Sequence, residues 1–409
     1  MLILADSPQT RPALSALFVV CLVAAIVPIV SHLLPDRPPQ VVLLLLGGIL
    51  IGPSVFDLAK PADIQLIADL GLGFLFLLAG YEVEATSLRG TIGRRAIGGW
   101  LASLGLATIA VFLMSEIGFI RAPVPIAIGL TTTALGTLLP IMRDRGMQQG
   151  ILADCVTACG AVGELLPVLG IALVLGAYSS WIEVIAISAV CAVGWALTTL
   201  GRRARGTALE RVLAATAHGT AQTTLRWTMV ILVGLLLLTS RFGIDSVLGA
   251  FLAGLVLRHW TSADAGESFD RKLDTIGYGL FIPVFFVVSG MSLDLASIGR
   301  QPIRLLLFFF LLIAVRGLPL LIFFRGVLRF LPRLQLMFLS ATTLPLLVAV
   351  TTLGVQDGHM LPANAAALVG AGMLSVAVCP LIGIRVLGSL DRKSTERDSG
   401  RSTAISSGP

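Results

Sequence analysis

Two ionisable residues lie in the middle of long apolar stretches. Glu164 is part of GAVGELLPVLG, and Arg316 is part of FLLIAVRGLPLLIF. A charged side chain inside an apolar helix is costly, so it is a functional candidate by default. A carboxylate withdrawn from water prefers its neutral, protonated form, whereas arginine keeps its charge at any ordinary pH. The alternative is that the two residues only fix the packing between helices, as a buried pair.

Three further acids lie nearer the ends of apolar stretches, at Asp69, Glu82 and Asp154. Helix capping and placement at the membrane interface explain such positions more often than ion chemistry does. Asp154 is the hardest to dismiss, because it could line a cytoplasmic vestibule that leads to Glu164. We therefore treat Asp154 as a secondary candidate.

Two polar runs, TTTALGT at 131–137 and TTLP at 342–345, interrupt apolar stretches. Clusters of Thr, Gly and Pro disfavour continuous helix and release backbone carbonyls and amides. Such groups form ion sites in transporters built from inverted repeats, although each run alone would also suit ordinary helix packing. We expect four threonines to line a site beside Glu164: Thr132, Thr133, Thr342 and Thr343.

The composition defines the elements that must position these residues. Of 409 residues, 56% are hydrophobic and 13% are charged, and the mean hydropathy is +0.94. Soluble domains contain about 25% charged residues. The composition therefore excludes a soluble enzyme, a disulfide-stapled secreted domain and a disordered chain. It predicts an all-α polytopic membrane protein.

A helix needs about 20 apolar residues to cross the hydrocarbon core. On that basis the sequence predicts thirteen spans. The first has no small-residue cleavage site after it, so we interpret it as a retained helix. The spans lie near 13–34, 40–56, 64–81, 96–115, 123–142, 150–176, 181–200, 225–240, 244–258, 274–293, 303–324, 334–355 and 362–388.

The distribution of Lys and Arg predicts the orientation of these spans. With the N-terminus outside and the C-terminus in the cytoplasm, 22 of the 29 Lys and Arg residues fall on the cytoplasmic side and 6 fall outside. The positive-inside rule favours this arrangement. The formal charge of +6 is therefore explained by the lipid bilayer as partner, and we expect no nucleic acid.

We interpret residues 1–390 as one transmembrane domain, with core helices that include 123–176 and 303–388. Residues 201–224 form a basic connector, and residues 391–409 are predicted to be a disordered cytoplasmic tail. No nucleotide-binding fingerprint is present, and the five cysteines lie in apolar stretches without partners for a metal site. We expect neither a cofactor nor a resident metal ion.

Five segments resemble those of the monovalent cation:proton antiporter-2 family in order and spacing. The first, GILIGPSV at 48–55, resembles the family's G-x-x-x-GP-S-V segment. The others are IADLGLGFLFLLAGYEVE at 67–84, TTTALGTLLPIMRDRG at 131–146, GAFLAGLVL at 249–257 and PVFFVVSGMSLDL at 283–295. The resemblance extends over about residues 13–388.

The resemblance implies a thirteen-helix inverted-repeat fold with a dimerisation domain and a mobile core domain, in which the fifth and twelfth helices are broken and cross. It also implies a homodimer that exchanges Na⁺ or K⁺ for H⁺ by alternating access, in a bacterial inner membrane, and not an enzyme. In the family, the sixth helix carries Asp-Asp or Asn-Asp, and the second carboxylate binds cation and proton in turn. This chain has Gly163 and Glu164 there, and Arg316 where electrogenic relatives have Lys.

On this resemblance, Glu164 is the ligand of the transported cation and of the proton in turn, and Arg316 supplies a fixed charge. Threonine oxygens and freed carbonyls complete the shell. With one titratable carboxylate, we expect one-for-one, electroneutral exchange. Two alternatives stay open. One is an organic-anion transporter whose substrate sits against Arg316 in the room left at Gly163, and the other is a non-transporting membrane sensor.

Overall fold

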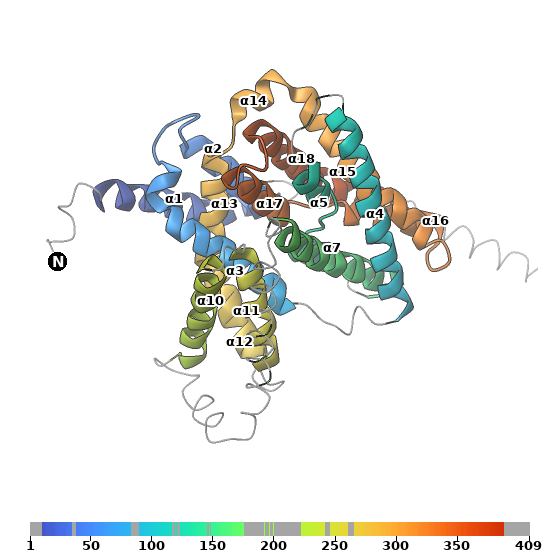
Figure 1. The fold of residues 1–409 in the computed structure, drawn as a ribbon, viewed down its shortest axis with the longest axis horizontal. Coiled ribbons are helices and arrows are strands. Elements are labelled where there is room, and N and C mark those ends of the chain that lie inside the picture. The colour runs from blue at the N-terminus through green and yellow to red at the C-terminus, as the bar shows by residue number, and fades with distance from the viewer. Residues whose placement is uncertain are drawn as a thin grey trace, which may run out of the picture. The chain divides into compact units, whose positions relative to one another are not determined.

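The structure, a computed structural model, is helical throughout the residues that it describes (Figure 1). The described residues are 10–34, 38–82, 90–116, 118, 120, 123–144, 147, 149–175, 192, 196, 199, 222–241, 246–260 and 266–387. No strand occurs among them, which agrees with the predicted all-α class. The predicted tail 391–409 and most of the predicted connector 201–224 lie outside the described residues.

The chain divides into two compact units. The first unit comprises Met1–Val83 and Val168–Leu293, and the second comprises Glu84–Pro167 and Asp294–Pro409. The elements of the first unit are α1 (Thr10–Leu33), α2 (Gln40–Ile51), η2 (Pro61–Ile64), α3 (Gln65–Glu82), α10 (Thr223–Arg241), α11 (Ser246–Trp260), α12 (Gly266–Ile276), η3 (Gly277–Phe281) and α13 (Ile282–Met291).

Small residues allow two helices of the first unit to pack at close range. A Cβ atom built at Gly80 of α3 would lie 2.1 Å from the backbone oxygen of Phe251, and one at Gly254 of α11 would lie 2.0 Å from that of Leu77. Close backbone approach through small residues is typical of helices that pack within a membrane. Any larger side chain at these positions would separate α3 from α11.

The second unit holds every candidate site residue named above except Asp69 and Glu82. Its helix α7 continues past the boundary of the unit at Pro167. Its elements are α4 (Thr91–Glu116), α5 (Pro123–Leu130), α6 (Leu135–Asp144), α7 (Ile151–Leu175), α14 (Leu295–Arg300), α15 (Pro302–Phe323), α16 (Phe330–Ser340), α17 (Pro345–Gln356), α18 (Pro362–Pro380) and η4 (Leu381–Val386).

Two predicted spans of the second unit are broken, as expected from their polar runs. The span 123–142 is divided between α5 and α6 by a non-helical segment at 131–134. The span 334–355 is divided between α16 and α17 by a non-helical segment at 341–344. Pro345 is the first residue of α17, where the missing N–H of proline costs nothing. Threonines, poor helix formers, occupy both breaks.

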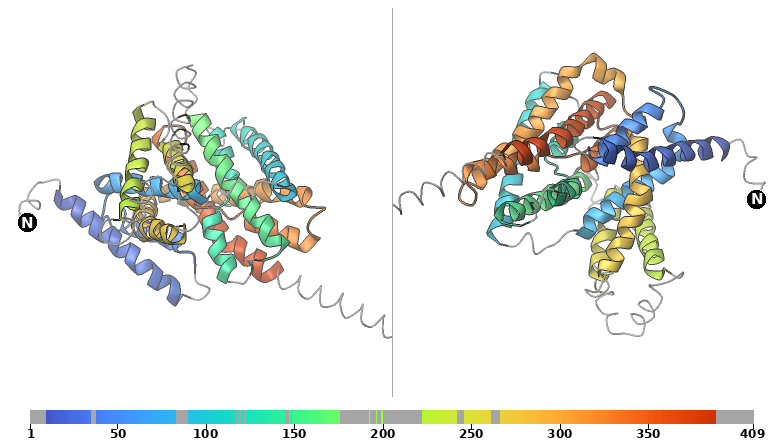
Figure 2. Two further views of the ribbon diagram at one scale, coloured as in Figure 1. Left: turned by 90° about the horizontal axis from the view of Figure 1, so that it is seen from below. Right: turned by 180° about the vertical axis from the view of Figure 1, so that it is seen from behind.

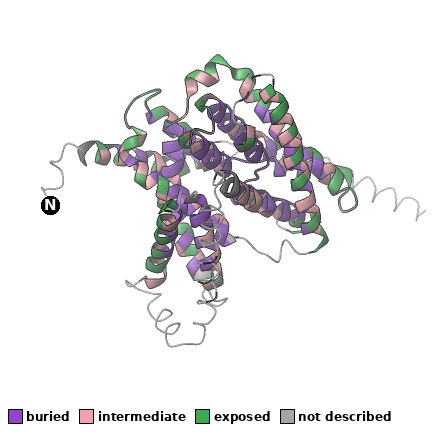
Figure 3. Cartoon of the chain, viewed as in Figure 1, coloured by how far each residue is buried: buried purple, intermediate pink, exposed green. Residues whose placement is uncertain are grey.

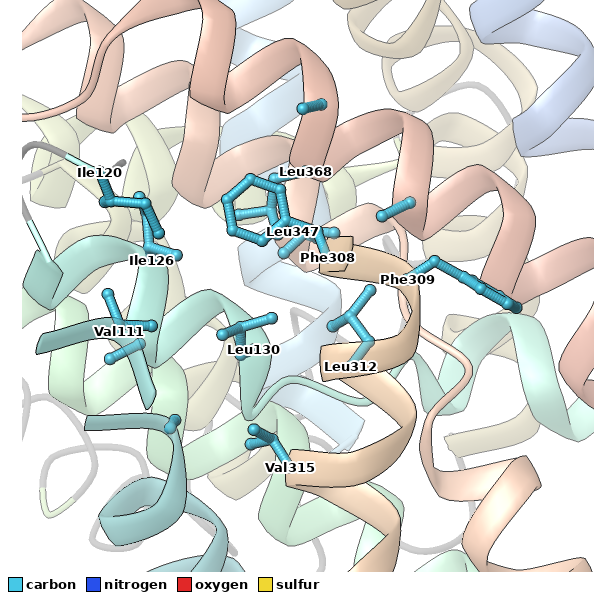
Figure 4. Close-up of a cluster of buried hydrophobic side chains, with 14 of the residues drawn as sticks. Val111, Ile120, Ile126, Leu130, Phe308, Phe309, Leu312, Val315, Leu347 and Leu368 are labelled. Carbon is cyan, nitrogen blue, oxygen red and sulfur yellow. The ribbon is translucent and has the colours of Figure 1, made fainter. Parts of the chain in front are cut away.

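The core of the second unit packs around α15. Phe308, Leu312 and Val315 on one face of this helix are fully buried. They join a cluster with residues of α5, α17 and α18 that include Leu130 and Leu347 (Figure 4). The views in Figures 1 and 2 show α15 in orange beside α18 in red. This apolar packing holds the helices on which the two breaks lie.

Nine helices of the described part are long and apolar enough to cross a membrane. The apolar helices Gln40–Ile51 and Val247–Arg258 are shorter. Helix α17 is mostly buried, whereas α4 exposes one face (Figure 3). The predicted span 181–200 lies almost wholly outside the described residues. The count of thirteen spans therefore stays a prediction, while the all-helical, multi-span class is confirmed for the described part of the chain.

Candidate functional site

The two non-helical segments, at 131–134 and 341–344, meet in the second unit. The backbone N–H of Ala134 donates a hydrogen bond to the carbonyl oxygen of Thr342, at 2.9 Å. Thr131 and Thr132 bond back to the last turn of α5 through their N–H groups. The first break is therefore closed partly by its own helix and partly by the other break. This crossing is the arrangement that the sequence resemblance implied.

Threonine hydroxyls line the crossing and are fully buried. The Oγ1 atoms of Thr132 and Thr343 lie 2.5 Å apart, and Thr132 Oγ1 also bonds to the carbonyl oxygen of Gly129, at 2.7 Å. A hydroxyl has one proton to give, so Thr343 is the donor to Thr132 when Thr132 donates to Gly129. The two broken helices are thus joined by side chains as well as by backbone.

Glu164 lies beside the crossing, at the N-terminal end of α6. The backbone N–H of Leu135, the first residue of α6, donates to Glu164 Oε1 at 2.7 Å. One residue earlier on α7, the carbonyl oxygen of Gly163 accepts a hydrogen bond from the N–H of Thr133, at 2.9 Å. A helix N-terminus carries unpaired N–H groups and partial positive charge, which favours a carboxylate. The half-buried carboxyl group therefore has a fixed position.

Arg316 of α15 is fully buried, and its guanidinium contacts the first break and helix α7. Its Nε donates to Thr133 Oγ1 at 2.8 Å, and its Nη2 donates to the carbonyl oxygen of Cys159 at 2.6 Å. Thr133 Oγ1 in turn donates to the carbonyl oxygen of Ser340, the last residue of α16, at 2.7 Å. A helix C-terminus is partially negative, so this position stabilises a cation.

One N–H₂ group of Arg316, at Nη1, has no hydrogen-bond partner within the described part of the chain. The two hydrogen bonds that the guanidinium makes with described residues go to oxygen atoms without formal charge, Thr133 Oγ1 and the carbonyl oxygen of Cys159. The predicted role of Arg316 as a fixed charge is compatible with these contacts.

Gly163 has a steric role that its sequence position did not reveal. A Cβ atom built at Gly163 would lie 2.7 Å from Arg316 Nη2 and 2.7 Å from Thr133 Oγ1. Such distances require a neighbour to move, and both neighbours are held by hydrogen bonds. The space at Gly163 is therefore filled by the Arg316 side chain. It is not an open cavity.

The structure brings most of the predicted site residues together, although Thr342 contributes differently from the expectation. Its carbonyl oxygen accepts the bond from Ala134, while its hydroxyl bonds within its own helix end, to Phe338 at 3.4 Å. Asp154 is exposed in the first turn of α7. Ten residues of helix, about 15 Å, separate it from Glu164.

The two remaining acids lie in the first unit. Asp69 is exposed on α3 and accepts a hydrogen bond from Gln65 Nε2 at 2.8 Å, which fits an interfacial role. The side chain of Glu82 lies outside the described residues. Among the residues that the structure describes, no three His, Cys, Asp or Glu side chains cluster as metal ligands.

Ser375 of α18 is a site residue that sequence reasoning missed. Its buried hydroxyl accepts a hydrogen bond from the N–H of Thr343 at 3.1 Å and lies 2.9 Å from the carbonyl oxygen of the same residue. Ser375 therefore holds the second break through the backbone of Thr343, whereas Thr132 contacts the hydroxyl of that residue. A lone serine in an apolar helix carries no signal of this contact, because the contact depends on how α18 packs.

Comparison with known proteins matches the sequence of this chain to a family. The family model described as "Sodium/hydrogen exchanger, transmembrane" matches residues 21–387. YjbQ of Bacillus subtilis, named as an Na(+)/H(+) antiporter, is 23% identical over 389 residues, which is 87% of this chain and 60% of YjbQ. Na(+)/H(+) antiporter NhaS4 of Synechocystis is 23% identical over 295 residues, 64% of this chain and 70% of NhaS4.

The fold is also similar to a solved structure. The sodium proton antiporter MjNhaP1 from Methanocaldococcus jannaschii aligns with a TM-score of 0.63 at 19% identity, over 93% of this chain and 100% of that chain. Cation/H(+) antiporter 18 of Arabidopsis thaliana is 25% identical over 326 residues, 72% of this chain. The chain spans 60% of the length of YjbQ and 39% of that of the Arabidopsis relative.

The chain belongs to the transmembrane sodium/hydrogen exchanger family. It is a multi-pass membrane protein, and its family consists of transporters and not of enzymes. The resemblance inferred from the sequence is thereby confirmed, as is the antiporter fold.

Proposed function

We propose that this chain exchanges a monovalent cation, Na⁺ or K⁺, for H⁺ by alternating access, with Glu164 as the shared carrier of cation and proton. The observation that carries the proposal is the position of the Glu164 carboxyl group. It lies at the start of a broken helix, bonded to the N–H of Leu135 and next to the crossing of two breaks. The family and the named relatives support the same activity.

The coupling follows from the charge of the carrier. With a proton or a cation bound, the Glu164 carboxylate is neutralised and can pass between the two faces of the membrane. Without a ligand, the bare charge is held back by the cost of moving it through a low-dielectric region. Oxygen atoms of Thr132, Thr133, Thr342 and Thr343 supply ligands of the kind that alkali and other hard cations prefer.

Arg316 adds a fixed positive charge and no transported proton. Its hydrogen bonds to Thr133 and to the Cys159 carbonyl keep it in place, and its guanidinium does not titrate at working pH. Gly163 contributes no second acid. One carboxylate then binds one proton or one monovalent cation, so exchange is one for one and electroneutral.

We place the chain in a bacterial inner membrane because bacterial antiporters are among its relatives. Its N-terminus is placed outside because of the distribution of its Lys and Arg residues. A homodimer is the assembly expected from the family resemblance. Crosslinking of membranes before solubilisation tests the assembly, and protease protection of a C-terminal tag tests the orientation.

The organic-anion alternative required room at Gly163 beside Arg316. Crowding there counts against it, because Arg316 Nη2 itself fills the position of the missing side chain. No observation favours the sensor alternative over exchange.

The decisive experiment uses purified chain in vesicles with an imposed pH gradient. Addition of Na⁺ or K⁺ is expected to dissipate the gradient in wild-type vesicles. Glu164→Gln keeps the shape and one acceptor for the Leu135 N–H but cannot titrate. The exchange rate is therefore expected to fall by more than about 100-fold. Asp154→Asn is the matched control and is expected to keep wild-type exchange.

Wild-type rates in Glu164→Gln vesicles would contradict the carrier assignment. Loss of exchange in Asp154→Asn with retention in Glu164→Gln would transfer the carrier role to Asp154. A wild-type chain that leaves the pH gradient intact with both cations would contradict cation/proton exchange itself.

A further inference from the structure

A group of arginines surrounds the C-terminal end of α15 in the second unit. We call this group the arginine collar, and it consists of Arg95 at the start of α4, Arg325 in the α15–α16 loop and Arg333 on α16. The segments 90–115 and 302–356, which hold the collar, contain no Asp or Glu residue. The collar is therefore a concentration of positive charge without acidic residues in its own segments.

Two members of the collar are held rigidly by α15. Arg95 Nη1 donates to the carbonyl oxygen of Phe323 at 3.1 Å, and Arg333 Nη1 donates to that of Leu321 at 2.9 Å. These carbonyls end α15 and would otherwise lack partners. A guanidinium has five N–H donors, so each of these arginines uses one and keeps others for a ligand.

The loop brings a third arginine beside this pair. Gly326 passes so close to Arg95 that a Cβ built on it would lie 3.3 Å from both Nη1 and Nη2. The preceding residue, Arg325, is exposed, and its guanidinium makes no hydrogen bond or ion pair with the residues that the structure describes. Arg333 Nε is buried without a hydrogen-bond partner in the described residues. The collar therefore has guanidinium donors that no described residue accepts from.

Exposed apolar side chains adjoin these charges. Phe330 is 61% exposed and lies under the Arg333 guanidinium, whose carbon is 5.7 Å from the ring centroid. Ile322, in the last turn of α15, is 72% exposed. A free inorganic anion gains nothing from contact with apolar side chains. A phospholipid presents a phosphate and, next to it, hydrocarbon chains that can pack against them.

We propose that the arginine collar binds the phosphodiester headgroup of an anionic phospholipid, with Phe330 and Ile322 against the acyl chains. Basic residues near a membrane surface attract anionic lipids individually. The fixed geometry at the end of α15 makes this a site with defined donors. The proposal does not depend on the transported ion or on Glu164.

The test measures lipid binding to the purified full chain in an uncharged detergent. Phosphatidylglycerol and phosphatidylcholine with identical acyl chains are titrated and detected by native mass spectrometry. The wild-type chain is expected to retain phosphatidylglycerol preferentially. Arg325→Gln, which removes no contact within the protein, is expected to weaken phosphatidylglycerol binding about fivefold, the factor for about 1 kcal/mol per basic residue.

The double variant Arg95→Gln/Arg325→Gln is expected to weaken phosphatidylglycerol binding about 25-fold. Neither the single Arg325→Gln variant nor the double variant is expected to change phosphatidylcholine binding. The matched control is Arg300→Gln. Arg300 is an exposed arginine that ends α14, before the opposite end of α15, and its loss is expected to leave phosphatidylglycerol binding unchanged. Thermal unfolding without added lipid distinguishes a loss of stability from a loss of lipid binding. Of the substitutions used, only Arg95→Gln removes a contact to α15.

Three results would overturn the proposal. They are equal losses in Arg325→Gln and Arg300→Gln, no preference of the wild-type chain for phosphatidylglycerol, and displacement of the lipid by an equal concentration of inorganic phosphate. The last result would identify a site for free anions instead of a lipid site.

Discussion

At the scale of single residues, Gly163 and Arg316 form a complementary pair. The guanidinium of Arg316 occupies the volume into which a side chain at position 163 would project. Arg316 and an acid at position 163 could not both take these positions without a shift. The sequence showed both departures separately, but it could not show that they share one space.

This packing predicts the effect of the smallest possible addition. Gly163→Ala places a methyl group 2.7 Å from Arg316 Nη2 and Thr133 Oγ1, so we expect destabilisation of about 1–3 kcal/mol, the usual cost of overpacking. The measurement is thermal unfolding in detergent, together with exchange in vesicles. Gly105→Ala on α4 is the control, because no atom lies within 4 Å of its added Cβ. Equal stability of the two variants would contradict the steric pairing.

At the scale of elements, the sequence predicted the two breaks because the cause is local. Threonine runs and a proline such as Pro345 destabilise a helix wherever they occur. Composition alone therefore locates the non-helical segments within a few residues. The partners of the breaks are not local. Which Thr342 group faces the crossing, its carbonyl or its hydroxyl, depends on the rotation of α16 about its axis, and the contact of Ser375 depends on the register of α18.

Ser375 leads to a prediction at this scale. Ser375→Ala leaves the buried N–H of Thr343 unpaired, and an unpaired buried donor costs about 1–3 kcal/mol. Because Thr343 pairs with Thr132 at the crossing, we expect the KM for the cation to rise about fivefold or more with a smaller change in maximal rate. Ser375→Cys, which keeps a similar size and a weak acceptor for the Thr343 N–H, is expected to restore part of the affinity.

The control for this variant is Ser103→Ala. Ser103 is equally buried, but its hydroxyl bonds to the Gly99 carbonyl of its own helix, at 2.9 Å. An equal rise in KM in both variants would show a general loss of stability instead of a displaced crossing.

At the scale of the whole molecule, composition and charge pattern predicted the class and the helical spans. Long apolar runs such as 303–324 specify a spanning helix by themselves. The ends of spans that stop at a glycine and a proline were harder to predict. Helix α2 ends at Ile51, before Gly52 and Pro53, whereas the predicted span ended near residue 56. The division into two compact units has no signal in local composition, because each unit combines segments that are distant along the chain. Only the family resemblance implied a division of the chain into two domains.

The proposed single carboxylate predicts the response of the whole transporter to voltage. One-for-one exchange moves no net charge, so the steady-state exchange level is expected to be the same at every membrane potential. A net charge of one would add about 2.3 kcal/mol per 100 mV. The measurement follows Na⁺-driven proton release in vesicles clamped by a K⁺ diffusion potential. An exchange level that shifts with voltage would show a second titrating group and contradict the electroneutral reading of Gly163, Glu164 and Arg316.

The hydrogen bond from Leu135 to Glu164 makes the first peptide of α6 sensitive to what the carboxylate carries. An N–H bonded to an ionised oxygen is held more strongly than one bonded to a neutral acid. Under the proposed mechanism, the first turn of α6 is therefore tightest when the carrier is empty and looser when a proton is bound. The amide hydrogen of Leu135 is then an internal reporter of occupancy, whose exchange with deuterium distinguishes the empty carrier from the protonated one without any added label.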